Sequence, residues 1–340
     1  MRLRLCSAAT LLLFLLGCGS TETPNIDFSP KVALAWIKNV EYGGFFAAES
    51  LGYYDEVGIQ PIFLPGGPNA PVPVVSVVAG KAQIGFSNDL YRLIDAVALG
   101  NDLVVLGAQY QVHPGGVISY ASKPVLEPED LVGIRFLGQE GSESTLDTVL
   151  SLAGLPVEYS YLPAGYSIAP FVNKLGDAYH GFATNQPITL ELKYGLEQGK
   201  DFIFTSFDSL GMPSYANLIF CRRAFLEEDF ETVVRFLHGS IQGWNYSFAN
   251  PDYAPTIVVE EHGRQLGLEI EQQKKQNRVQ EGFMKNNVNQ KNGLFWVDPK
   301  KLEEKMYPWL RASGRNQLPV PSDFIDTRAL VEAYSRIKKG

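Results

Sequence analysis

The sequence predicts an α/β protein built as two lobes with a ligand cleft between them. Short apolar segments alternate with segments whose apolar residues repeat at helical spacing, and this alternation is typical of βαβ units with parallel sheets. It ends near residue 117 and then starts again, so that two α/β units of similar size follow one another. A chain that leaves one lobe, builds a second and returns forms a hinged cleft, and ligands bind there beyond the carboxyl ends of the strands.

Residues 1–17 have the composition of a cleaved secretion signal. Two arginines precede an apolar run over residues 8–16, which is shorter than the about 20 residues that span a bilayer. The segment Leu15-Leu16-Gly17-Cys18 resembles a bacterial lipobox, and that resemblance implies cleavage before Cys18 and lipidation of its thiol. The alternative is an ordinary signal followed by a chance cysteine. We expect residues 18–30 to be a lipidated tether that holds the protein at the extracytoplasmic face of the cell membrane.

Composition and charge exclude several functions. The formal charge is −8, and loss of the two signal arginines makes it more negative, so the chain lacks the surplus of Lys and Arg that nucleic acid binding needs. Cys6 lies in the signal, which leaves Cys221 as a lone strand residue and excludes a disulfide within one mature chain. The histidines are isolated, and no nucleophile elbow or phosphate-binding loop is present. We therefore expect no metal site, no cofactor and no catalysis.

The first lobe is expected to alternate four strands with three helices. The strands are Val32–Trp36, Gln60–Leu64, Gln83–Phe86 and Leu103–Ala108. The helices are Phe45–Asp55, Val74–Ala79 and Leu90–Leu99. Gly80 and Gly100 follow the last two helices, because glycine readily takes the left-handed conformation that closes a helix.

The second lobe repeats this alternation. Its expected strands are Leu131–Leu137, Val157–Tyr161, Tyr179–Ala183 and Asp201–Thr205, and its helices are Ser144–Ala153 and Ala169–Leu175. Crossings near Val117–Ser122 and Ala216–Cys221 give residues 31–117 and 222–340 to the first lobe and 118–221 to the second. The remainder is expected to be helical, with the polar stretch Glu269–Asn292 forming a solvated helix and loop.

Four segments of the first lobe resemble the NMT1/THI5-like solute-binding proteins. They are Trp36–Ala48, Gly52–Ile59 (which reads G-Y-[FY]-x-x-x-G-[IL]), Pro65–Pro68 and Val78–Gly85. The resemblance implies a periplasmic-binding-protein fold and the role of capture subunit for an ABC importer, with a permease and its ATPase as partners. The family includes binders of thiamine pyrimidine precursors, riboflavin, and sulfonate- or nitrate-like anions.

Five candidate ligand-binding residues lie at or after strands of the first lobe. Trp36 ends the first strand, Glu41 and Tyr42 lie in the next loop, Asn88 follows the third strand and Tyr110 follows the fourth. An indole, a carboxylate and a phenol suit a flat heterocycle, whose rings stack while polar groups bind its edge. Structural alternatives remain: Trp36 as a core residue, Glu41 as a solvated charge at a helix start, and Asn88 as a helix cap.

Four further candidates belong to the second lobe. Ser144 lies at the start of a helix, where unpaired backbone N–H groups suit a ligand oxygen. Plain helix capping is the alternative for this serine. Tyr166, Asn185 and Gln186 follow strands of the second unit. Because both lobes point such loops into the cleft, we expect the ligand to touch both of them.

The candidate loops favour a mostly neutral aromatic ligand. They offer aromatic and carboxamide side chains rather than the Arg or Lys that an anion site needs. Riboflavin is the leading interpretation, because the number of aromatic candidates suits a tricyclic ring. A thiamine pyrimidine precursor, formylaminopyrimidine or hydroxymethylpyrimidine, is the alternative and fits Glu41 equally well. A THI5-like pyrimidine-synthesising enzyme is disfavoured, because the chain has no cysteine cluster.

Overall fold

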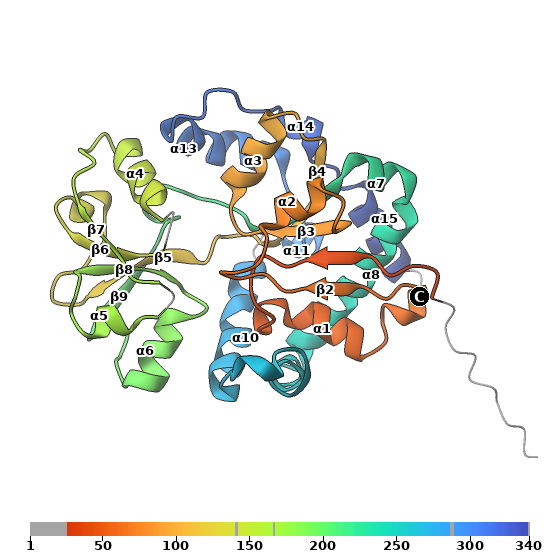
Figure 1. Cartoon of the computed structure of the whole chain (residues 1–340), viewed down its shortest axis with the longest axis horizontal. Helices are drawn as coiled ribbons and strands as arrows, with labels where there is room; N and C mark the ends of the chain where they lie inside the picture. The colour runs from red at the N-terminus through yellow and green to blue at the C-terminus, as the bar shows by residue number, and fades with distance from the viewer. Residues whose placement is uncertain (1–25, 140–141, 166, 286–288, 339–340) are drawn as a thin grey trace, which may run out of the picture.

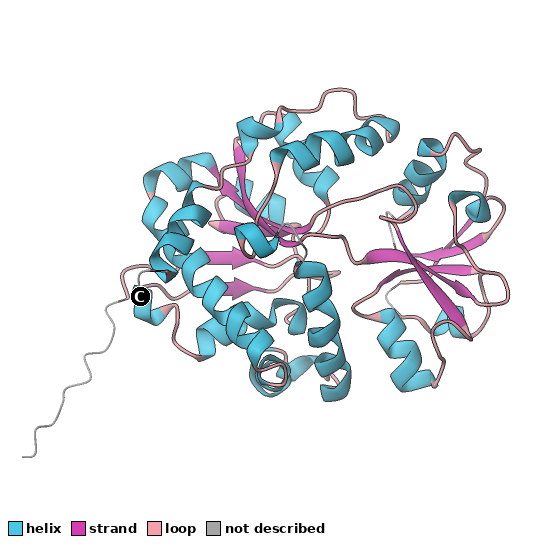
Figure 2. Ribbon diagram, turned by 180° about the vertical axis from the view of Figure 1, so that it is seen from behind, coloured by secondary structure: helices cyan, strands magenta, loops and turns pink. Residues whose placement is uncertain are grey.

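The computed structural model describes residues 26–139, 142–165, 167–285 and 289–338, and it consists of two lobes, each with its own β-sheet. The two sheets stand apart in Figure 1 and, seen from behind, in Figure 2. The predicted lipidation site Cys18 and the candidate Tyr166 lie outside the described residues. Within the described ranges, no helix is both long and apolar enough to cross a membrane.

The sheet of the first lobe has the strand order β2-β1-β3-β10-β4. Its strands are β1 (Lys31–Ala33), β2 (Ile62–Leu64), β3 (Ile84–Ser87), β4 (Leu103–Tyr110) and β10 (Ala216–Arg222). β1 runs parallel to β2 and β3, whereas β10 is antiparallel to β3 and β4. The sheet is therefore mixed, and the expectation of a parallel sheet is wrong for β10. The boundary predicted at residue 221 assigns most of β10 to the second lobe. The strand instead pairs with β3 and β4 and so belongs to the first lobe.

The sheet of the second lobe has the order β7-β6-β8-β5-β9. Its strands are β5 (Gly115–Tyr120), β6 (Arg135–Gly138), β7 (Ser160–Pro163), β8 (Ala178–Phe182) and β9 (Phe202–Ser206). β6 is parallel to β7 and β8, and β5 is antiparallel to β8 and β9. The segments 111–114 and 207–215 connect the sheets, and the His113 N–H donates to the Ser214 carbonyl at 2.9 Å. These paired connections are the place where the lobes can hinge.

Helices pack on both faces of the first sheet. Alternate residues of β4 point to opposite faces, so Val104 and Leu106 enter one hydrophobic cluster while Leu103 and Val105 enter another. Helices α4, α5 and α6 lie in the second lobe, between strands of its sheet in sequence. The helices of both lobes, in chain order, are α1 (Gly43–Ser50), α2 (Pro73–Val78), α3 (Leu90–Ala98), α4 (Glu143–Leu152), α5 (Ala169–Val172), α6 (Gln186–Tyr194), α7 (Arg223–Glu228), α8 (Phe230–Ala249), α9 (Tyr253–Ile257), α10 (Ile270–Met284), α11 (Asn289–Asn292), α12 (Pro299–Lys301), α13 (Tyr307–Ala312), α14 (Pro321–Phe324) and α15 (Arg328–Ile337). As expected, the chain beyond residue 225 is largely helical.

Helices α1 and α8 cross closely because glycines lie at their contact. A Cβ at Gly44 would lie 2.2 Å from the Trp244 ring, and a Cβ at Gly243 would lie 2.1 Å from the Gly44 carbonyl oxygen. The crossing stacks Phe45 against Phe236, with ring centroids 6.1 Å apart. It holds α1 in place and thereby supports the preceding loop, residues 34–42, which leads to the cleft.

Helix α10 is not the solvated helix that its polar composition suggests. It buries Gln273, Gln276, Asn277 and Gln280, and Gln273 and Gln280 hydrogen-bond to the buried backbone of Val40. It also packs on α6 of the second lobe, and Figure 1 shows it beneath the gap between the sheets. A helix that follows both sheets in sequence therefore becomes a bridge between the lobes.

The described end of the predicted tether rests on the first lobe. The Asp27 N–H donates to the Gly58 carbonyl at 2.9 Å, Phe28 forms a parallel bridge with Ile59, and the Asp27 carboxylate pairs with Arg235 at 2.9 Å. From Asp27 onward the segment therefore belongs to the folded lobe, and residues 27–30 of the predicted tether are part of that lobe.

Candidate functional site

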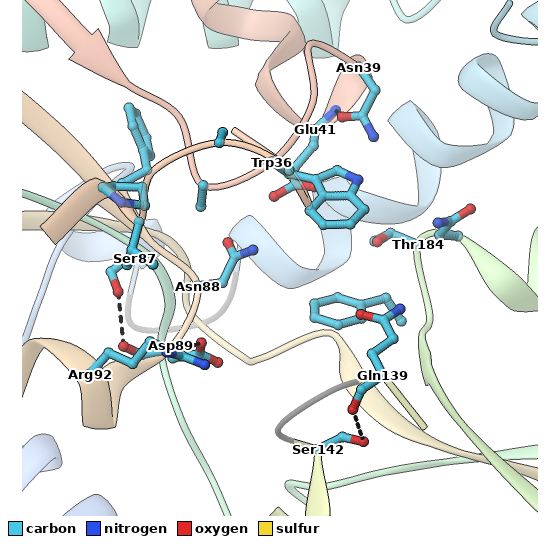
Figure 3. Close-up of a pocket in the computed structure, with 18 of the residues that line it drawn as sticks. Trp36, Asn39, Glu41, Ser87, Asn88, Asp89, Arg92, Gln139, Ser142 and Thr184 are labelled. Carbon is cyan, nitrogen blue, oxygen red and sulfur yellow. Dashed lines mark hydrogen bonds and ion pairs between the residues drawn. The ribbon is translucent and has the colours of Figure 1, made fainter. Parts of the chain in front are cut away.

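A cavity of about 290 Å³ lies between the two lobes. The first lobe lines it with the loop after β1 (including Trp36, Asn39 and Glu41), residues 70–73 and the loop after β3. The second lobe contributes Gln139, Ser142, Thr145, His180, Phe182, Thr184, Asn185 and Gln186, and α10 adds Gln276. Figure 3 shows side chains from both lobes facing this space. Five sequence candidates thus line one cavity: Trp36, Glu41, Asn88, Asn185 and Gln186.

The loop that carries Trp36 is held from below by Tyr42. The Tyr42 hydroxyl accepts hydrogen bonds from the Ala35 and Trp36 N–H groups, both at 3.1 Å. Tyr42 is fully buried and is not among the residues that line the cavity. The phenol therefore does not supply the ligand contact expected from the sequence, because its ring packs in the core against Phe86. Its hydroxyl instead determines the path of the loop.

Glu41 lies beside Trp36 at the cavity wall (Figure 3). Its carboxylate accepts a hydrogen bond from Asn217 Nδ2 at 2.8 Å, and its carbonyl oxygen accepts one from Gln109 Nε2 at 2.5 Å. Burial raises the pKa of Glu41 to about 7, although the hydrogen bond from Asn217 opposes the shift. Near neutral pH the group therefore exists in both forms and can accept a hydrogen bond or donate one.

Two polar interactions shape the loop after β3. The Ser87 hydroxyl donates to the Asp89 carbonyl oxygen at 2.9 Å, and Arg92 pairs with the Asp89 carboxylate at 2.7 Å. The Asp89 side chain forms no cap on α3, and Asn88 lines the cavity rather than capping that helix. Arg92 is the one Lys or Arg among the described residues that line the cavity, and Asp89 balances its charge.

Tyr110 does not line the cavity. It is 2 % exposed, and its hydroxyl donates to Gln280 Oε1 at 2.9 Å. The expectation that this side chain lines the cleft is wrong because β4 continues to Tyr110 and directs the ring into the core next to α10. Gln280 also donates to the Val40 carbonyl at 2.8 Å. Tyr110 therefore supports the 34–42 loop through α10.

The second-lobe candidates separate into two groups. Asn185 and Gln186 line the cavity. Gln186 Oε1 also accepts from the Phe182 N–H at 2.7 Å, and Asn185 Oδ1 accepts from Gln272 on α10 at 3.2 Å. Ser144 instead faces a neighbouring groove, while Ser142 and Thr145, on either side of it in sequence, reach the cavity. The helical turn explains this difference, because successive residues of α4 point in different directions.

Several lining residues were not predicted from the sequence. His180 and Phe182 lie two apart on β8 and so share one face of the sheet. Burial lowers the pKa of His180 to about 4, so its imidazole is neutral at pH 7, and its Nδ1 has no hydrogen-bond partner among the described residues. Gln139 directly follows β6, so the expectation that ligand-binding residues follow strands could have identified it. Gln276, on a helix late in the chain, offers no such signal.

Nothing in the described residues forms a cluster of three or more His, Cys, Asp or Glu side chains suited to a metal ion. Cys221 is buried in β10, and burial raises the pKa of its thiol to about 12. A thiol with that pKa stays protonated near neutral pH and is a poor nucleophile.

Comparison with known proteins identifies the family. The model of the family described as NMT1/THI5 like matches residues 39–254. The chain is 24 % identical to the formylaminopyrimidine-binding protein of Halalkalibacterium halodurans, over 94 % of this chain and 96 % of that protein. It is also 24 % identical to the riboflavin-binding protein RibY of Chloroflexus aurantiacus, over 94 % of this chain and 95 % of that protein.

The fold has close structural relatives. The alkanesulfonate-binding protein SsuA from Xanthomonas axonopodis pv. citri, solved with bound MOPS, superposes with a TM-score of 0.59 at 13 % identity, over 87 % of this chain and 98 % of SsuA. At this identity the likeness concerns the fold, which is the two-lobe fold of periplasmic binding proteins. The protein belongs to the NMT1/THI5-like family.

Proposed function

We propose that this protein captures riboflavin outside the cytoplasm and delivers it to an ABC permease. The observation that carries the proposal is the composition of the cavity, which combines aromatic side chains from both lobes with many carboxamides. Trp36 comes from the first lobe and Phe182 from the second. Closure of the lobes on a flat ring would place aromatic side chains on both sides of it, and such contacts favour planar ligands.

The carboxamides suit the polar edge of an isoalloxazine ring. That edge presents an N–H donor between two carbonyl acceptors, and Asn and Gln side chains offer both a donor and an acceptor. The cavity contains Asn39, Asn88, Gln139, Asn185, Gln186 and Gln276. In the sequence, the number of aromatic candidates favoured riboflavin, but Tyr42 and Tyr110 do not line the cavity. The carboxamides of the cavity now support the same ligand instead.

The charges of the cavity argue against a sulfonate or nitrate ligand. Arg92 is paired with Asp89, and Glu41 adds an acidic group beside Trp36. An anion would gain little from a neutralised cation, and it would be repelled by an ionised carboxylate. A neutral ring avoids both penalties.

An aminopyrimidine is the second candidate, and Glu41 favours it. An aminopyrimidine presents an amino donor next to a ring nitrogen acceptor. A protonated carboxyl group offers the matching O–H donor and carbonyl acceptor, and the raised pKa of Glu41 makes this form accessible near neutral pH. The relative that binds formylaminopyrimidine supports the same alternative.

Ligand titration distinguishes these candidates. The protein is first unfolded and refolded, so that it carries no ligand from the cells in which it was made. We expect riboflavin to bind with one-to-one stoichiometry and its fluorescence to be quenched, without any turnover. Formylaminopyrimidine and MOPS serve as competitors in the same calorimetric series. Tight binding of formylaminopyrimidine without riboflavin binding would replace the leading ligand, and tight binding of MOPS alone would refute an aromatic site.

We further propose that Cys18 carries the lipid anchor. The lipobox-like segment supports this, and Asp27, nine residues after Cys18, already contacts the first lobe. In a bacterial host, Cys18→Ala should release the protein from the membrane fraction, while Cys221→Ala should leave it there. Equal membrane recovery of both variants would refute the anchor.

A further inference from the structure

A second cavity adjoins the proposed riboflavin site. This groove has a volume of about 290 Å³ and lies between α4 of the second lobe and α13 of the first. Tyr91 and Thr145 line both the groove and the main cavity. The two spaces are therefore adjacent, with Tyr91 of the first lobe and Thr145 of the second at their common boundary.

One wall of the groove is a row of hydroxyl groups on α4. Ser144, Thr145, Thr148 and Ser151 all line it, since residues three or four apart share a helix face. The Thr148 hydroxyl donates to the Ser144 carbonyl oxygen at 2.6 Å, and this leaves its own oxygen able to accept. Such a wall favours a ligand group that carries its own O–H donors.

The charges of the groove select against an anion. Arg315 forms a two-point ion pair with Asp95, at 2.7 Å and 2.9 Å. The other charged residue of the groove is Asp147, whose Oδ1 accepts from the Tyr159 hydroxyl at 2.6 Å. A carboxylate has further lone pairs for O–H donors, but it repels a phosphate. The lining therefore suits a neutral polyol better than a phosphate ester.

We infer that this groove is the subsite for the ribityl chain of the ligand, a site for a neutral polyol attached to the ring in the main cavity. The aromatic side chains of Tyr91 and Trp309 also line the groove, and carbon atoms of such rings can pack against the C–H groups of a polyol chain. This inference rests on the proposed function, and it adds a selectivity: the protein would take riboflavin in preference to both its phosphate ester and the bare ring.

The test compares three flavins on the full-length folded protein. Lumiflavin carries a methyl group where riboflavin carries the ribityl chain, and riboflavin phosphate adds an anion at the end of that chain. We expect riboflavin to bind at least about tenfold more tightly than either, as a few neutral hydrogen bonds would give. Asp147→Asn and Ser151→Ala should each weaken riboflavin by about two- to tenfold and leave lumiflavin unchanged.

Glu158→Gln and Ser160→Ala are the matched controls, since both residues are exposed on the second lobe and line neither space. These two control variants should bind riboflavin and lumiflavin with the same affinities as the wild type. Equal affinity for riboflavin and lumiflavin, or equal losses for both ligands in Asp147→Asn and Ser151→Ala, would overturn the polyol subsite while leaving the flavin site in place. Failure of both flavins to bind would overturn the proposed ligand and the subsite together.

Discussion

The two walls of the cleft are built differently. On the first lobe, buried polar side chains hold the 34–42 loop. They are the loop's own Tyr42 hydroxyl and two glutamines from the distant helix α10: Gln273 Oε1 accepts from the Val40 N–H at 2.9 Å, and Gln280 Nε2 donates to the Val40 carbonyl at 2.8 Å. The second wall is braced in part by neighbours in sequence, such as Gln186 on Phe182 and Ser142 on the Gln139 carbonyl, and its Asn185 also accepts from Gln272 on α10.

This difference assigns different tasks to the two lobes. A loop fixed by long-range buried hydrogen bonds is preorganised, and it can present Trp36 and Glu41 before the ligand arrives. The second wall, which is braced in part by local contacts, supplies contacts as the lobes close. We therefore expect substitutions on the first wall to cost more affinity than comparable substitutions on the second, and the predictions below test that ranking.

The largest effect should come from Trp36→Ala. Loss of a stacking partner on the preorganised wall should cost about 1–3 kcal/mol of binding free energy, or about ten- to a hundredfold in Kd. Phe182→Ala, on the second wall, should cost less. Flavin fluorescence titration of both variants measures the two losses, and a greater loss in Phe182→Ala would reverse the assignment of the walls.

Tyr42→Phe should weaken binding although Tyr42 does not line the cavity. Removing its hydroxyl leaves the Ala35 and Trp36 N–H groups without their acceptor, at a cost of about 1–3 kcal/mol in the free energy of unfolding. Urea unfolding and ligand titration should both respond. Tyr120→Phe is the matched control, since its hydroxyl donates to the Phe171 carbonyl in the second lobe. That variant should lose stability but retain affinity.

Glu41→Gln should raise stability in a way that depends on pH. Burial in the folded protein raises the pKa of Glu41 from 4.5 to about 7. The free energy of unfolding of the wild type therefore falls as pH rises from about 4.5 to about 7, and it stays at the lower value at higher pH. The variant carries no such penalty, and its advantage should reach about 1–3 kcal/mol at pH 8 and vanish near pH 4. Chemical unfolding at several pH values measures this, and an advantage independent of pH would contradict it.

Glu231→Gln is the control, because its effect on stability should have the opposite sign to that of Glu41→Gln. Arg336 and Arg235 lower the pKa of Glu231 to about 2, so its contribution to stability is present above pH 4.5 and disappears as pH falls towards 2. The variant should therefore be less stable than the wild type at neutral pH, with the difference fading in acid. Because the side chain is 45 % exposed, we expect the effect to be small.

Lys275→Ala should have the smallest effect. Lys275 on α10 pairs with Glu191 on α6 across the lobes, and the two side chains are 42 % and 29 % exposed. Such a pair contributes about 0.2–1 kcal/mol, and salt screens it. Affinity should fall by about fivefold at most at low salt. Lys274→Ala, whose partner Glu271 lies on the same helix, should leave affinity unchanged.

The sequence predicts the elements of the fold better than the sheet order. The alternation of apolar segments predicts most strands and helices to within a few residues, because it reflects burial. It does not show that β10 returns antiparallel between β3 and β4, since strand pairing depends on contacts distant in sequence. For the same reason the polar helix α10 reads as solvated, although its glutamines find partners far away along the chain.

The site follows the same logic. Trp36, Asn88 and Asn185 lie where strands end, and a rule based on strand ends finds them. Tyr42 and Tyr110 satisfy the same rule but turn into the core, because the direction of a side chain depends on the register of its element. His180 lies within β8, and its position on the cleft face becomes clear only once the sheet order is known.

Hydrogen exchange with and without riboflavin tests the central claim most directly, that the ligand is held between a preorganised wall and a closing wall. Bound riboflavin should slow exchange in residues 180–186 of the second lobe and in the loop after β1, with the larger change in the second lobe, since the first is already ordered. Protection confined to one lobe, or absent from both despite saturating ligand, would contradict the account.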